Sequence, residues 1–81
     1  MGGSDKLEPL CLDVTGEICP LPLLKLKLAL RNMSNHEEVV LLASDSTSLK
    51  DIPAFCRIAG HNLLECETVD DIYQFRIQKQ G

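Results

Sequence analysis

A continuous apolar run near the middle of the chain, Val39-Val40-Leu41-Leu42-Ala43, limits the possible folds more than any other feature. A strand that is apolar at every position is typical of the interior of a sheet that is covered on more than one side. The run therefore predicts a central strand.

Patterns on either side of this run predict three more strands and two helices. Alternating residues indicate strands at 10–14, 62–67 and 72–79, and in the last of these Tyr73, Phe75 and Ile77 share one face. Helix-forming residues predict helices from the Cys19 region to about Met33 and from Ser48 or Asp51 to Ala59. The order βαβαββ, with right-handed crossovers, predicts an α/β two-layer sandwich: a four-stranded mixed sheet with both helices on one face. Residues 1–8 are expected to be a flexible N-terminus, and 9–81 a single domain.

The start of the second helix can be interpreted in two ways. Ser48 and Asp51 resemble a capping box, whereas Pro53 inside the pattern indicates a kink or a start near Asp51. Asp45 is expected to be a helix cap or turn residue, and Gly60 ends the helix.

Composition argues against several classes of function. The net charge is −4, the opposite of the basic excess that a nucleic-acid binder usually carries, so direct nucleic-acid binding is not expected. No apolar run is long enough to span a membrane. The chain has four cysteines without an export signal or zinc spacing, so we expect a cytoplasmic protein without a metal or other cofactor.

The motif Cys19-Pro20-Leu21-Pro22 is the best candidate for chemistry. With Cys19 at the N-cap and Pro20 at the first helical position, the thiol would lie at the positive end of the helix dipole, which lowers a cysteine pKa. Gly16 in the preceding turn, with Pro20 and Pro22, would set the geometry. Glu17 should oppose thiolate formation somewhat. Cys56 is expected in the core, and Cys11 and Cys66 are expected to be structural.

A self-sufficient cysteine enzyme also needs a general base beside the sulfur. The two histidines, His36 and His61, fall in a polar loop and just after the second helix, and neither suggests a dyad. These observations favour a carrier over a stand-alone enzyme.

The segment 13–22, Asp-Val-Thr-Gly-Glu-Ile-Cys-Pro-Leu-Pro, resembles the signature of the TusA/SirA-like family. Asp45, the segment 51–55 and Gly60 resemble its second block, and the similarity covers roughly residues 9–79. The resemblance implies a sulfur carrier that accepts sulfane sulfur as a persulfide on Cys19 by sulfurtransferase-type chemistry. It also implies a cysteine desulfurase or rhodanese-like donor and an acceptor protein in tRNA thiolation, cofactor assembly or sulfur oxidation.

The predicted first helix has a second apolar side beside its core-facing one. Leu21, Leu24 and Leu28 project there, near Lys25. These leucines belong either to a partner-docking patch with Lys25, Lys27 and Arg31 as its basic rim or to a deeply packed helix with both sides partly covered. Two other functions remain open: a non-catalytic regulatory or RNA- or protein-binding module, and a redox protein in which Cys19 pairs with Cys56.

Overall fold

Two helices and four strands make up the part of the chain that the computed structural model describes, residues 9–80. In chain order they are β1 (Leu10–Val14), α1 (Leu21–Arg31), β2 (Glu38–Ala43), α2 (Ser48–Ala59), β3 (Asn62–Val69) and β4 (Ile72–Gln78). The element order matches the prediction. The segment 1–8, predicted to be flexible, lies outside the described residues.

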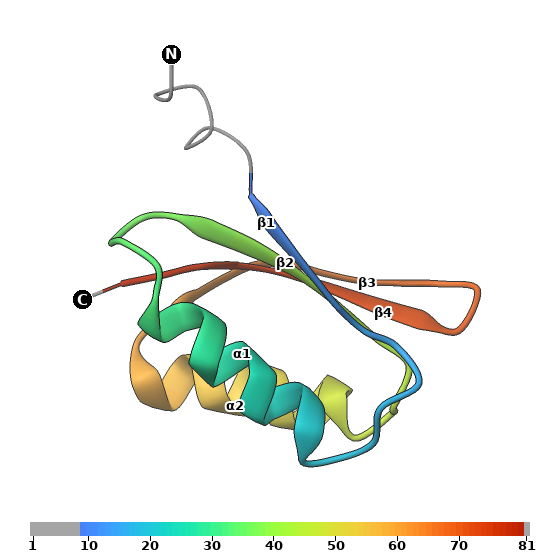
Figure 1. Ribbon diagram of the computed structural model, residues 1–81. Helices are drawn as coiled ribbons and strands as arrows, with labels where there is room; N and C mark the ends of the chain where they lie inside the picture. The colour runs from blue at the N-terminus through green and yellow to red at the C-terminus, as the bar shows by residue number, and fades with distance from the viewer. Residues whose placement is uncertain (1–8, 81) are drawn as a thin grey trace.

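The four strands form one mixed sheet in the order β1-β2-β4-β3. β1 runs parallel to β2, with Val14 opposite Ala43, while β4 is antiparallel to both of its neighbours. Both helices lie on the same face of this sheet (Figure 1). The predicted two-layer α/β sandwich is therefore confirmed.

The central position of β2 in the sheet is also confirmed, but the prediction that both of its faces are covered is not. Val39, Leu41 and Ala43 are buried on the helical side, whereas Val40 and Leu42 on the other side are only half-buried. The continuous apolar run suggested cover on both sides. Because both crossovers place their helix on the same face, residues 9–80 form no second layer on the opposite face.

The core lies between the sheet and the two helices. Leu26 and Leu30 of α1 and Ile52 of α2 pack with Phe75 and Ile77 of β4 in one buried cluster. Full burial of such side chains stabilises the fold by about 1.5–3 kcal/mol each. The strongest contribution of the sequence to the fold is thus the apolar periodicity of these elements.

The turn between β3 and β4 explains why β3 is longer than predicted. Asp70 and Asp71 have φ values of 50° and 66°. Two successive residues of positive φ match the twist of a tight hairpin, and Asp tolerates this conformation. The two-residue turn lets β3 continue to Val69 instead of ending at Glu67.

α2 begins before Asp51, the start that one of the two interpretations proposed. Its first residue is Ser48 and its N-cap is Thr47, without a side-chain cap hydrogen bond, so the capping box with Asp51 was wrong. The helix continues through Pro53 to Ala59, and Gly60 (φ 85°) ends it as expected. Pro53 leaves the Leu49 carbonyl without its usual donor, which is tolerable because Leu49 is exposed.

Candidate functional site

The candidate site lies at one edge of the sheet, where two parallel strands end. β1 and β2 are paired in parallel, so the loops that follow Val14 and Ala43 leave from the same edge. The first loop carries Cys19 and the second carries Asp45. This topology brings together two segments that are distant in the sequence.

The first loop is held at its start by local hydrogen bonds. The Asp13 carboxylate accepts hydrogen bonds from the Thr15 amide (2.9 Å) and hydroxyl (2.7 Å), and these lower the pKa of Asp13. Asp13 therefore braces this turn. Gly16 follows with φ 85°, a conformation that favours glycine, and its amide donates to the Ser44 hydroxyl at 2.7 Å. The turn is therefore tied to the loop that follows β2.

Cys19 is exposed and is held between two carboxylates. Its amide donates to Asp45 Oδ2 at 2.6 Å, and its Sγ lies 3.4 Å from Asp51 Oδ2, close enough for the thiol to donate. Asp45 belongs to the loop after β2 and Asp51 to the first turn of α2. The cysteine is thus positioned by contacts with the second half of the chain.

Cys19 does not occupy the predicted N-cap. α1 begins at Leu21 with Pro20 as its N-cap, because the Pro20 carbonyl accepts the first helical hydrogen bond, from the Leu24 amide at 3.0 Å. Pro22 is the second helical residue and is buried. The Cys19–Pro20 peptide bond is cis.

The pKa of the Cys19 thiol is raised, contrary to the sequence-based expectation. The main cause is the hydrogen bond to Asp51, followed by desolvation and by the negative charges of Asp51 and Asp45. Hydrogen bonds from Thr47 and from the Cys19 amide lower the pKa of Asp45, which keeps that negative charge beside the cysteine. The structure therefore favours a protonated thiol at rest.

Glu17, expected to oppose thiolate formation, has a different partner. Its carboxylate pairs with Lys25 Nζ at 2.5 Å, and it is not among the causes of the Cys19 shift. The pair also neutralises part of the basic rim that Lys25 was expected to provide.

The outer side of α1 is open. Leu21, Leu24 and Leu28 are 45%, 46% and 56% exposed, so this side of the helix is not deeply packed. Ile18, one residue before Cys19, is 70% exposed, although the sequence analysis gave it no role. We call Ile18, Leu21, Leu24 and Leu28 the α1 apolar patch.

The other three cysteines differ in their surroundings. Cys56 is buried, as predicted, and burial raises its pKa to about 11. Cys11 and Cys66 lie in strands but are exposed, so neither contributes to the core. All four thiols are free. A Cys19–Cys56 redox pair would require Cys56 to leave the core.

Asp45 and Asp51 are the site residues whose role the sequence analysis missed. Local patterns assigned both to helix capping, because acidic residues near a helix start usually serve that purpose. The only sequence feature that pointed to a role at the site was that both residues belong to the second block of residues that resembles the TusA/SirA-like family.

Fold and site together define a class of small carrier proteins: an open α/β sandwich whose motif cysteine is exposed and is held by the loop after β2 and the first turn of α2. A family model described as sulfurtransferase TusA matches residues 11–79. The chain therefore belongs to the TusA family, and the predicted sulfur-carrier function is confirmed. Such a carrier works between a sulfur donor protein and a sulfur acceptor protein.

Relatives and a solved structure agree with this assignment. The chain is 42% identical over 67 residues to a protein of Neisseria meningitidis serogroup A that is described as a sulfur carrier, covering 83% of this chain and 90% of the relative. It is 35% identical over 68 residues to the sulfur carrier protein TusA of Buchnera aphidicola, covering 84% and 86%.

The crystal structure of a SirA-like protein from Desulfitobacterium hafniense shares the fold. It superposes with a TM-score of 0.76 at 20% identity, and the match covers 89% of this chain and 99% of the other. Within residues 9–80, neither helix is long and apolar enough to cross a membrane.

Proposed function

We propose that this protein carries sulfane sulfur as a persulfide on Cys19 and passes it to an acceptor protein. The observation that carries the proposal is the placement of Cys19: it is the exposed cysteine of the family motif, and Asp45 of the loop after β2 and Asp51 of the first turn of α2 hold it in place. Exposure is required because two different partners must reach the same sulfur atom. The donor is a cysteine desulfurase or a rhodanese-like protein.

The transfer needs no external oxidant. The Cys19 sulfur attacks the terminal sulfur of a donor persulfide, the sulfur–sulfur bond of the donor breaks, and its electron pair leaves on the donor sulfur. A new sulfur–sulfur bond forms on Cys19, and the thiol proton ends on the donor. One thiol and one persulfide have exchanged the terminal sulfur.

Asp51 fits the role of the proton acceptor in this step. A thiol must lose its proton to become a strong nucleophile, and the Asp51 carboxylate lies at hydrogen-bond distance from Sγ. At rest the same carboxylate keeps the thiol protonated. A protonated thiol is less easily oxidised than a thiolate, so this arrangement protects the exposed cysteine while no partner is bound.

The α1 apolar patch is the surface that we assign to the sulfur donor. It adjoins Cys19 directly, since Ile18 precedes the cysteine and Leu21 begins the helix. An exposed apolar surface with a polar rim is typical of a protein-binding site. Pro20 and Pro22 keep this surface at a fixed angle to the thiol.

Mass spectrometry after incubation with a cysteine desulfurase and cysteine tests the loading step. We expect an adduct with the mass of one sulfur atom on a Cys19 peptide, and no adduct in a Cys19→Ser variant that remains folded. An adduct that persists in that variant would contradict the proposal. A rhodanese-like protein with thiosulfate serves as the second donor.

A pair of matched variants tests the docking surface. Leu24 of the patch and Leu64 of β3 are similarly exposed, at 46% and 44%. Leu24→Glu should slow loading by the donor protein without changing the reaction of Cys19 with a small alkylating reagent. Leu64→Glu should change neither rate, and equal effects of both variants would remove the patch from the account.

A further inference from the structure

A hollow lies toward the end of α1 that is far from Cys19. It has a volume of about 310 Å³ and is lined by Lys27, Leu30, Arg31, Phe55, Ala59, His61 and Lys79. Cys19 precedes the first turn of α1, whereas Arg31 is its last residue, and a helix of 11 residues is about 16 Å long. The hollow is therefore separate from the sulfur site.

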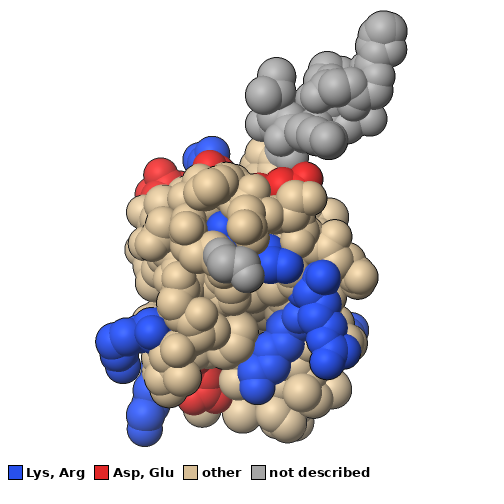
Figure 2. All heavy atoms as spheres, turned by 90° about the vertical axis from the view of Figure 1, so that its left-hand side faces the viewer, with Lys and Arg blue, Asp and Glu red and all other residues tan. Residues whose placement is uncertain are grey.

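The charged side chains of the hollow are all cationic. Lys27, Arg31 and Lys79 are three of the eight Lys and Arg residues in a chain whose net charge is −4, and none of the lining residues within 9–80 is acidic. Figure 2 views the molecule from this end and shows Lys and Arg side chains gathered there, with acidic side chains toward the margins.

Among residues 9–80, no carboxylate forms an ion pair with these cations. Across residues 9–80 the ion pairs are Lys25 with Glu17 and Arg76 with Glu38, and neither involves the hollow. Lys79 Nζ donates to the Met33 carbonyl at 2.7 Å, which fixes its position without cancelling its charge. Within the described part of the chain, no ion pair therefore neutralises the three cations of the hollow.

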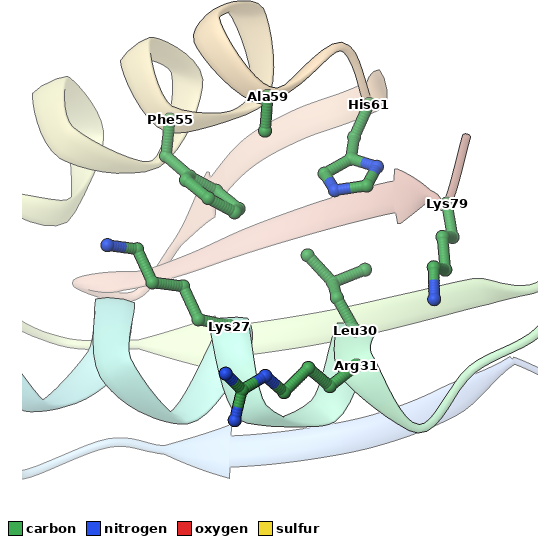
Figure 3. Close-up of a pocket in the computed structure, with 7 residues that line it drawn as sticks. All are labelled: Lys27, Leu30, Arg31, Phe55, Ala59, His61 and Lys79. Atoms are coloured by element: carbon green, nitrogen blue, oxygen red, sulfur yellow. The ribbon is translucent and has the colours of Figure 1, made fainter. Parts of the chain in front are cut away.

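The rest of the lining supplies apolar and aromatic contact (Figure 3). Leu30 is buried, and the rings of Phe55 and His61 lie 5.8 Å apart. Lys27 Nζ lies 5.5 Å from the centre of the Phe55 ring. His61 Nδ1 accepts a hydrogen bond from the Gln80 amide at 3.0 Å, so the proton of the neutral ring is on Nε2, which is a donor. The polar side-chain groups here are therefore donors.

We propose that this hollow binds a phosphate ester whose organic part is apolar or aromatic. Lys27 and Arg31 would hold the phosphate by charge-assisted hydrogen bonds, and the organic part would lie against Phe55. A helix C-terminus alone favours a cation, which accounts for Arg31. It does not account for Lys27 and Lys79, which come from other positions and also line the hollow.

Nuclear magnetic resonance with phenyl phosphate as the probe tests the site. We expect saturable shifts of the backbone amides of Lys27, Arg31, Phe55 and His61. Phenol, and sodium chloride at the same ionic strength, should not produce them, and inorganic phosphate should produce them more weakly. Shifts that never saturate, or equal shifts with sodium chloride, would overturn the proposal.

Two matched arginines separate a specific site from general charge. Arg31 and Arg57 each lie in the last turn of their helix, but only Arg31 lines the hollow. Arg31→Gln should weaken phenyl phosphate binding by about tenfold, the loss expected for one charge-assisted contact. Arg57→Gln should leave binding unchanged, and equal losses in both variants would refute the site.

Binding of a short single-stranded oligonucleotide shows whether the phosphate belongs to a small ester or to a nucleic-acid strand. Weaker binding of the oligonucleotide than of phenyl phosphate supports a small ester. Tighter binding at the same amides would overturn that assignment in favour of a nucleic-acid strand. Sulfur loading of Cys19 does not depend on any of these results.

Discussion

Burial of Cys56 should separate the four thiols by their reactivity. At pH 8 a thiol with a pKa of about 11 is ionised to about one part in a thousand, whereas a free cysteine with a pKa of about 8.5 is ionised to about one part in four. Because the thiolate is the reactive form, ionisation alone slows Cys56 about 250-fold. Its side chain is only 1% exposed, which slows it further.

The assay counts thiols with a small disulfide reagent at pH 8. The exposed residues Cys11, Cys19 and Cys66 should react in a fast phase, and Cys56 should react at least about 100-fold more slowly. All four should react rapidly in urea. A Cys56→Ala variant should lose only the slow phase. Four thiols in the fast phase, or loss of Cys19 and Cys56 together on mild oxidation, would refute this reasoning and favour the redox alternative.

Three further predictions concern pH, the sulfur site and the core. Since burial raises the Cys56 pKa, the native state holds this proton between about pH 8.5 and 11 while the unfolded state releases it. The free energy of unfolding, measured by urea denaturation, should therefore fall over that range by up to about 2–3 kcal/mol more than in Cys56→Ala. The same pH dependence in both proteins would contradict this. Asp51→Asn should lower the Cys19 pKa and speed its alkylation at constant pH, because the main cause of the raised pKa is removed; an unchanged rate would exclude that cause. Leu26→Ala should lower the free energy of unfolding by about 2–5 kcal/mol, whereas a change at the exposed Leu28, Leu28→Ala, should lower it by less than about 0.5 kcal/mol. Equal losses would show that the wrong face of α1 is assigned to the core.

Most of the fold could be predicted because periodicity reports which face of an element is buried. The alternation of Phe75 and Ile77 in β4 and the spacing of Leu26 and Leu30 in α1 are direct records of the core. The apolar run of β2 was ambiguous in this respect. Val40 and Leu42 are apolar on a face that no helix covers, so the run indicated a central strand without showing how many faces were covered.

The electrostatics of the sulfur site could not be predicted from local sequence. The motif around Cys19 predicts a helix start, and the dipole argument uses only that helix. Asp45 and Asp51 are brought to the cysteine by the parallel pairing of β1 with β2 and by the start of α2, which are long-range features. Their two carboxylates reverse the direction of the pKa shift that the helix alone would produce.

The central claim is that Cys19 alone is sufficient to carry sulfur. The most direct test is a variant in which Cys19 is the only cysteine, with Cys11→Ser, Cys56→Ala and Cys66→Ser, incubated with a cysteine desulfurase and cysteine. Intact-mass measurement should show one added sulfur atom to the same extent as in the unaltered protein. A folded variant that takes up no sulfur, while the unaltered protein does, would contradict the account.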